Sequence, residues 1–232
     1  MSKTTRNLVL GVLFFLPVVF LLFLYPSTHN YTPLDIVNKD VKEISESETI
    51  KLKDHLTVLA FFGKQPLSKA IAASNLKELV YDKFKGFKTF QIVVMAPSGY
   101  EKDYNFLKKE VERYEDLRFW HYVFTSDENI KATYNSLKYD IPLDENLCTE
   151  EVFLIDKDLN QRGRLDDRDD SEVEKSTIVY GLNSYNCIEI EEVKNKMNDD
   201  MRILFTEYRQ KRKGKFDSSS RRANDLKANS NE

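Results

Sequence analysis

The chain contains 232 residues, of which 41% are apolar and 31% are charged, which fits one ordinary globular domain with additional segments. The formal charge of −3 gives no support for general nucleic-acid binding. Two cysteines and three histidines exclude a disulfide-dense scaffold and argue against a Cys/His zinc ribbon. The small total charge combines +2 in residues 1–25, −10 in 26–208 and +5 in 209–232.

Residues 8–25 form an uncharged apolar run, LVLGVLFFLPVVFLLFLY. As a helix, 18 residues span about 27 Å, close to the hydrocarbon thickness of a bilayer. Lys3 and Arg6 precede the run and the next basic residue is Lys39, so the positive-inside rule places the N-terminus in the cytoplasm. The sequence therefore predicts a single-pass signal anchor. A cleaved signal peptide is the alternative, although no small-x-small site follows the run.

The middle of the chain alternates apolar runs with amphipathic segments. LTVLAFFG and TFQIVVMA are mainly apolar without a regular polar alternation, which indicates strands buried on both faces. Ser98 and Ser126 are candidate N-caps of two helices. The expected elements are strand 56–63, helix 68–84, strand 89–96, a helix after Ser98, strand 117–125, a helix after Ser126, strand 151–156, turn 157–160, hairpin strand 161–165 and helix 190–208.

This β-α-β-α-β-α-β-β-α order predicts parallel strands with helices on both faces and an antiparallel edge. The fold class is therefore α/β, a thioredoxin-like three-layer domain of the peroxiredoxin or Sco type with one N-terminal transmembrane helix. We expect a cytoplasmic N-terminus at 1–7, the anchor at 8–25, a linker and N-terminal extension at 26–50, the domain at 51–212 and a disordered basic tail at 213–232.

Two short stretches resemble the Sco/SenC family of membrane-anchored, thioredoxin-like proteins. TIKLKDHLTVLAFFG, residues 49–63, is similar to the family's entry into the domain. VFLID, residues 152–156, with the polar turn after it, is similar to the family's YLID-x-D-G strand and turn. The resemblance covers residues 32–208. It implies a setting in cytochrome c oxidase assembly, at the bacterial inner membrane with the domain in the periplasm.

Sco proteins carry Cys-x-x-x-Cys after the first core strand and a His before the YLID strand, and these residues bind copper. By this resemblance, Gln65 and Lys69 occupy the two cysteine positions and Cys148 the histidine position. An amide and an ammonium cannot replace the thiolates that Cu(I) prefers, nor can they exchange disulfides. We therefore expect a degenerate active-site loop, with no catalytic residue, metal or cofactor.

For the other candidate groups, the sequence favours structural roles over catalytic or metal-binding ones. Cys148 and Cys187 are a possible disulfide in an exported compartment, with separate thiols or a redox role as alternatives. The histidines, His29, His55 and His121, have no catalytic motif around them. Asp156, Asp158 and Asn160 match only the start of a calcium loop, because Gly is missing at its sixth position. The acidic run 166–174 favours a solvated loop over a cation or basic-partner site.

Two functions fit these observations. The first is a membrane-tethered, redox-inactive accessory protein that binds a protein partner in respiratory-oxidase assembly. The second is copper or thiol handling by Cys148, with Cys187, from a relocated site. Neither involves nucleic acid. The sequence favours the first, because the expected cysteine pair is absent.

Overall fold

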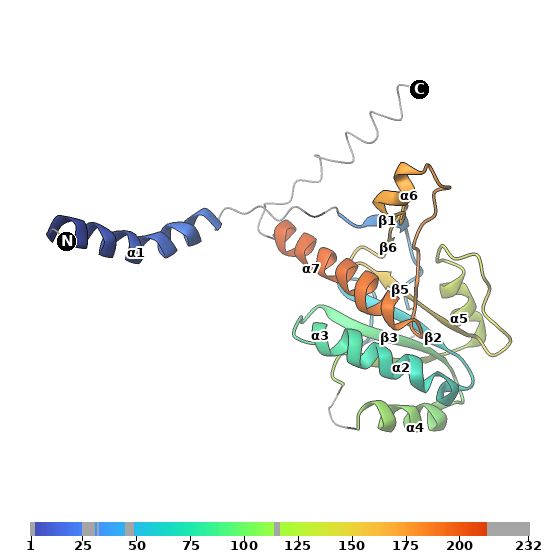
Figure 1. The fold of residues 1–232 in the computed structure, drawn as a ribbon. Coiled ribbons are helices and arrows are strands. Elements are labelled where there is room, and N and C mark those ends of the chain that lie inside the picture. Colours follow the sequence, from blue (N-terminus) through green and yellow to red (C-terminus); the bar gives the residue numbers. More distant parts are fainter. Residues whose placement is uncertain (1–2, 25–30, 32, 45–48, 114–116, 213–232) are drawn as a thin grey trace. The chain divides into compact units, whose positions relative to one another are not determined.

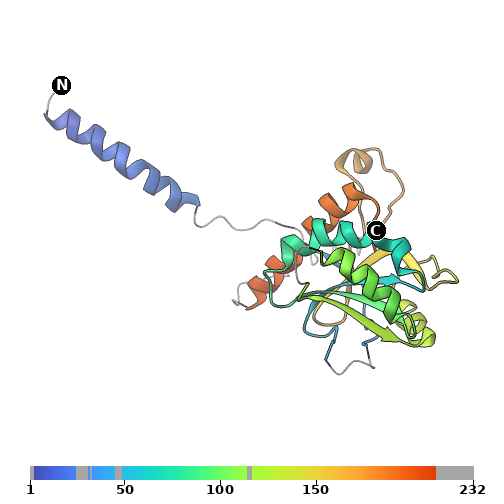
Figure 2. The same cartoon turned by 90° about the horizontal axis from the view of Figure 1, so that it is seen from below.

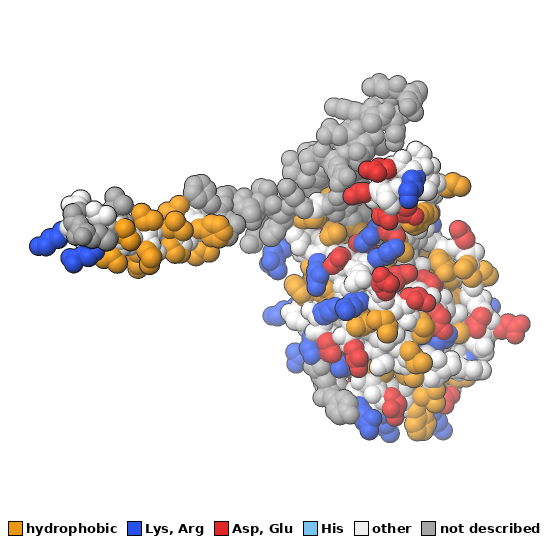
Figure 3. Space-filling model, viewed as in Figure 1, with side chains coloured by type: hydrophobic (Ala, Val, Ile, Leu, Met, Phe, Trp, Pro, Cys, Tyr) orange, Lys and Arg blue, Asp and Glu red, His pale blue; other side chains and the backbone are white. Residues whose placement is uncertain are grey.

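The computed structural model describes residues 3–24, 31, 33–44, 49–113 and 117–212, which belong to two compact units, 1–32 and 33–232. The first unit contains α1 (Lys3–Leu24), which is long and apolar enough to cross a membrane by length and composition. Figure 3 shows hydrophobic side chains around this helix and basic ones at its N-terminal end. The predicted apolar helix is thus confirmed as a candidate membrane span.

The second unit is built on a seven-stranded mixed sheet (Figure 1). Its strand order is β1-β6-β5-β2-β3-β4, with β7 paired to β5. The strands β2, β3 and β4 are parallel, whereas β5 runs antiparallel to β2, β6 and β7. The bounds are β1 Asp35–Asn38, β2 Leu56–Phe62, β3 Phe90–Pro97, β4 Trp120–Thr125, β5 Cys148–Ile155, β6 Gln161–Gly163 and β7 Tyr185–Asn186.

Helices cover both faces of the sheet, which gives three layers (Figures 1 and 2). Residues of α2, α4 and α7 pack with one face, and residues of α5 pack with the other. The bounds are η1 Pro66–Lys69, α2 Ala70–Leu76, η2 Lys77–Tyr81, α3 Asp82–Phe84, α4 Glu101–Val111, α5 Asp127–Tyr134, α6 Asp170–Glu174, η3 Glu192–Met197 and α7 Asn198–Arg212. η2 and η3 are π-helical turns that continue into α3 and α7.

Burial on both faces explains why the central strands are apolar without alternation. In β2, Val58 and Ala60 belong to the core under α2, α4 and α7, whereas Leu59 and Phe61 belong to the core under α5. A polar residue at any of these positions would lose its hydration without gaining a partner. The predicted α/β, thioredoxin-like fold class is confirmed by this topology.

The structure changes two details of the expected layout. Residues of the segment expected as a linker and extension, 26–50, form β1 and bury Leu34 and Val37, so the compact unit begins at 33 instead of 51. α4 begins after Tyr100 and not after Ser98, whereas Ser126 does cap α5 by accepting from the Asn129 N–H at 3.3 Å. The tail, 213–232, and His29 lie outside the described residues.

Candidate functional site

The candidate site lies where β2 ends and the chain turns into η1. Gly63 has a φ of 65°, and a Cβ there would clash with the Asn146 carbonyl oxygen and lie 2.8 Å from Cys148 Cβ. The Lys64 N–H donates to the same Asn146 carbonyl at 2.8 Å, and the Tyr104 hydroxyl donates to the Gly63 carbonyl at 2.8 Å. These contacts hold the loop after β2 against the segment that leads into β5.

Lys69, at the end of η1, is the charged centre of the site. Its side chain is only 11% exposed, and its Nζ lies 2.6 Å from Glu150 Oε1. Burial lowers the pKa of this ammonium, but the hydrogen bond to Glu150 and the nearby Cys148 outweigh burial and leave the pKa raised. Lys69 therefore stays protonated and cannot act as a base or a nucleophile near neutral pH.

Cys148, the first residue of β5, is held as a thiol. Its N–H donates to Asp144 Oδ1 at 2.8 Å, and its S–H donates to Asp144 Oδ2 at 3.2 Å. Partial burial and the Asp144 carboxylate raise the pKa of the thiol, although Lys69 acts in the opposite direction. Since the thiolate is the reactive form, this environment makes Cys148 a poor nucleophile at neutral pH.

Cys187 follows β7 and is fully buried. Its Sγ donates to the Glu150 carbonyl at 2.6 Å, and burial raises the pKa of its thiol well above the ordinary range. The β5–β7 register, Glu151 opposite Asn186, places Cys187 opposite Glu150, so Cys148 is a diagonal neighbour. The Cα atoms of such diagonal neighbours are about 7–8 Å apart, which is beyond the Cα–Cα distance that a disulfide usually spans. Both cysteines are free thiols in the structure, not the disulfide considered from the sequence.

The sequence-predicted site residues come together only in part. Lys69 and Cys148 are neighbours in the structure. Gln65 is exposed at the start of η1, where its carbonyl accepts from the Ser68 hydroxyl at 2.7 Å. Sequence reasoning missed Asp144 and Glu150, because no motif marks a carboxylate that pairs with a distant lysine or a thiol four residues away.

The residues at this site do not fit copper. A Cu(I) site built on the Sco pattern needs two thiolates, but the positions hold an exposed amide and a paired ammonium. The remaining thiol, that of Cys148, is hydrogen-bonded to a carboxylate that disfavours its ionisation. Among the described residues, no group of three or more His, Cys, Asp or Glu side chains could hold a metal ion.

The other candidates have structural partners. Asp156 accepts from the N–H groups of Asp158 and Asn160 at 2.9 Å each and from Arg162 at 3.0 Å, so the calcium-like spacing is a polar turn closed by an ion pair. His55 Nδ1 lies 3.0 Å from the Lys53 carbonyl. His121 is half-buried, and burial together with nearby His55 lowers its pKa.

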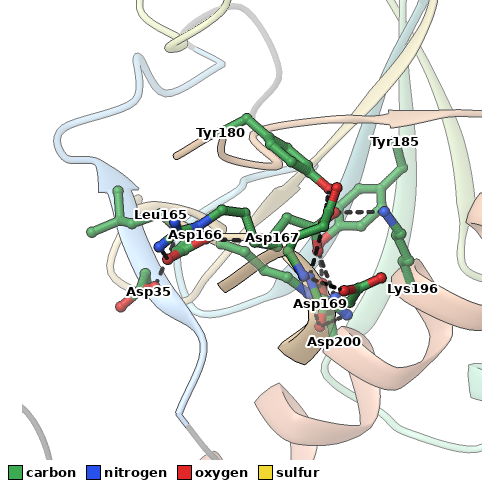
Figure 4. A network of polar contacts seen from close by, with 12 residues as sticks. Asp35, Leu165, Asp166, Asp167, Asp169, Tyr180, Tyr185, Lys196 and Asp200 are labelled. Carbon is green, nitrogen blue, oxygen red and sulfur yellow. Dashed lines mark hydrogen bonds and ion pairs between the residues drawn. The ribbon is translucent and has the colours of Figure 1, made fainter. Parts of the chain in front are cut away.

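Most of the acidic run 166–174 is used within the domain (Figure 4). Asp167 pairs with Arg164 and Lys196, and Asp166 pairs with Arg168. Asp169 caps α6 in a reciprocal capping box. These contacts tie the segment between β6 and β7 to η3, which explains the run without a bound cation.

Arg164 is the centre of this paired network, which also includes Asp167, Lys196, Asp200 and Tyr185. Arg164 makes a two-pronged contact with Asp200 at 2.9–3.1 Å, and the Tyr185 hydroxyl donates to Asp200 at 2.6 Å. Burial raises the pKa of Asp200, while Arg164 and Tyr185 oppose that shift. Every one of these side chains has a partner of opposite charge or a hydrogen bond, so the network has a structural role.

Comparison with known proteins gives likenesses of fold. No protein-family model and no curated protein matches the chain. Among solved structures, a SCO1/SenC family lipoprotein from Bacillus anthracis str. Ames is 17% identical with a TM-score of 0.48, over 72% of this chain and 96% of that one. The soluble domain of Sco1 from Bacillus subtilis is 15% identical with a TM-score of 0.41, over 72% and 91%.

A putative protein disulfide isomerase from Bacteroides thetaiotaomicron is 12% identical with a TM-score of 0.44, over 75% of this chain and 93% of that one. At these identities the likeness concerns the fold and not the activity. The domain has a thioredoxin-like fold, as its own strand order and strand directions show.

Proposed function

We propose that this chain is a membrane-tethered, redox-inactive accessory protein of the Sco/thioredoxin type that binds a protein partner during respiratory-oxidase assembly. The observation that carries the proposal is the chemistry at the end of β2, where Lys69 pairs with Glu150 and Cys148 donates to Asp144. An ammonium locked in an ion pair and a thiol held protonated leave the position without a reactive group.

The proposed location follows from α1 and the charges around it. Lys3 and Arg6 at the start of this apolar helix favour a cytoplasmic N-terminus, with the domain on the outer side of a bacterial inner membrane. A tether restricts the domain to the surface where membrane complexes assemble, which raises its effective concentration near such partners.

The test is complementation of a strain that lacks the chain. Cys148→Ser and Cys187→Ser, alone and together, should restore oxidase activity and haem-copper content to the wild-type level, because no thiol chemistry is required. Loss of restoration by the double variant, at unchanged membrane abundance and folding, would overturn the redox-inactive role. Absence of any oxidase defect in the strain would overturn the oxidase setting.

Thiol reactivity gives a second readout on the purified full-length chain. Cys148 should react with an aromatic disulfide reagent at pH 7.5 more slowly than a free cysteine, because burial and then the Asp144 carboxylate raise the pKa of its thiol. Asp144→Asn should accelerate the reaction several-fold, whereas Asp140→Asn, four residues earlier, should not. A fast wild-type reaction would contradict the redox-inactive assignment.

A second candidate function is copper or thiol handling by Cys148 and Cys187. It is favoured by one observation, that the Lys69 ammonium lies near both thiols and opposes the rise that burial causes in the pKa of each, although both pKa values stay raised. Titration with Cu(I) under a competing chelator, together with an insulin-reduction assay, tests it. Stoichiometric binding lost in Cys148→Ser would favour this candidate, and the absence of both activities would remove it.

A further inference from the structure

A groove with a volume of about 440 Å³ lies between the segment after α5 and the segment around β7. We name it the acidic groove and define it by Tyr139, Asp140, Ile141, Glu151, Glu189 and Glu192, which line it. It is separate from the Lys69–Cys148 position, because Glu150 and Glu151 project to opposite faces of β5. A groove of this size can accept several side chains of a bound segment.

The carboxylates of the acidic groove have no basic partner in the part of the chain that the structure describes. Among the described residues, no lysine or arginine lies within ion-pair distance of Asp140, Glu151, Glu189 or Glu192. Deeply buried carboxylates elsewhere behave differently, since Asp156 pairs with Arg162 and Asp200 with Arg164. The domain therefore pairs its deeply buried acids with basic side chains, but it leaves the partly buried Glu151 and Glu192 without a described basic partner.

Glu151 is the carboxylate that loses most water. It is about half-buried on β5, and its Oε2 accepts from the Ser184 hydroxyl at 2.7 Å. Burial, followed by the neighbouring carboxylates Glu192 and Glu150, raises its pKa. A cationic group in the groove would compensate this desolvation and repulsion at once.

The groove also offers apolar contact. Tyr139 and Ile141 form one wall, and Ile141 is 62% exposed. Ile188 and Ile190 flank Glu189 and are 40% and 55% exposed. Exposed aliphatic side chains next to uncompensated carboxylates fit a ligand that is both cationic and apolar, which a protein segment provides and a bare metal ion does not.

We propose that the acidic groove binds a segment of the partner protein in which a lysine or arginine is flanked by apolar residues. This inference rests on the proposed partner-binding function. The cation contacts Glu151 and Glu192, and the apolar neighbours contact Tyr139 and Ile141. Salt will weaken the charged part of this contact, because the groove is open to solvent.

The test uses the full-length chain in detergent and a fluorescent nine-residue peptide that alternates arginine with leucine. Glu151→Gln combined with Glu192→Gln should weaken binding about tenfold or more, because charge-assisted hydrogen bonds are lost. Glutamine still accepts from Ser184 and from the Asn186 N–H, so both variants should fold. Glu191→Gln, an equal charge change at an exposed neighbouring position, is the matched control.

Three outcomes of the binding test would overturn the proposal. The first is equal affinity of the double variant and the wild-type chain. The second is equal binding of a peptide with glutamine in place of arginine. The third is a large gain in affinity when residues 213–232 are removed, which would make the chain's own basic tail the occupant.

Cross-linking in cells separates failure of this inference from failure of the proposed function. If the wild-type chain captures an oxidase component and the double variant captures tenfold less, both proposals stand. If the two capture it equally, only the groove assignment fails. If the wild-type chain captures no oxidase component, the proposed function fails, whatever the peptide shows.

Discussion

Around Arg164, the buried carboxylates of Asp167 and Asp200 each pair with a basic side chain, whereas the carboxylates of the acidic groove have neither lysine nor arginine within ion-pair distance among the described residues. Both regions border the segment between β6 and η3, yet only the carboxylates around Arg164 are paired with basic side chains of the described domain. Buried charge that is paired holds a fold in one arrangement, while charge left uncompensated at a groove is available to a ligand.

The largest expected effect comes from breaking the paired network at its centre. Arg164→Met should reduce the free energy of unfolding by about 3 kcal/mol, because Asp200 would remain buried with only the Tyr185 hydroxyl. Urea unfolding of the full-length chain in detergent measures it. Arg118→Met, at an exposed position, should change stability by less than about 0.5 kcal/mol. Equal effects of the two variants would show that the network is not structural.

Removing the hydroxyl on the other side of Asp200 should have the next largest effect. Tyr185→Phe keeps the packing of the fully buried ring but removes a hydrogen bond to a charged group, at a cost of about 2 kcal/mol. Tyr180→Phe, whose hydroxyl contacts Glu172 at the surface, should cost much less in the same unfolding assay. A neutral Tyr185→Phe would mean that Arg164 alone satisfies Asp200.

A smaller loss is expected at the edge of the network. Lys196→Met should cost about 1 kcal/mol, because Asp167 keeps its contact with Arg164 at 2.7 Å. Lys194→Met, an exposed lysine two residues earlier, is the control. A loss as large as that of Arg164→Met would show that Lys196, and not Arg164, is the main partner of Asp167.

Removing a charge from the acidic groove should raise the free energy of unfolding, whereas the substitutions in the paired network lower it. The pKa of Glu151 is raised in the folded state above its ordinary value of 4.5, so the folded chain binds more protons there and loses stability as pH rises through the folded pKa. Glu151→Gln should therefore raise the free energy of unfolding at pH 7 by up to about 1 kcal/mol. The gain should vanish at or below pH 4.5.

Unfolding of Glu151→Gln and of the control Glu191→Gln across pH 4 to 8 measures this difference. A loss of stability at pH 7 would mean that Glu151 has a structural partner and that the two regions do not differ. A stabilising substitution that weakens binding would instead show that the groove keeps its charge for function at the expense of stability.

Much of the fold was predictable because its signals are local. The continuous apolar runs at β2 and β3, the cap at Ser126 and the polar turn after β5 each depend on neighbouring residues. A short strand-like piece could be expected after Thr32, but the bounds and the partner of β1 could not be predicted, because Asp35–Asn38 carry little apolar pattern and pair with β6 more than 120 residues later. A long-range pairing of this kind leaves no periodicity to detect.

The candidate site was predictable only in its chemistry. Gln65, Lys69 and Cys148 were named through the resemblance to Sco/SenC proteins, and residue type alone then shows that the first two positions hold no thiol. The partners Glu150 and Asp144 could not be named, because they depend on how the segment before β5 folds against Gly63. Nor could the sequence separate the carboxylates in the paired network from those in the groove.

The sequence by itself determined a candidate membrane helix, a fold class and the absence of a cysteine pair in the loop after β2, because each depends on residue type and spacing along the chain. The tertiary structure decided which acids are paired and which are not. Arg164 reaches Asp200 because α7 packs beside β6, and no described basic residue reaches Glu151 because β7 and the segment after α5 bring only acidic, polar and apolar side chains there.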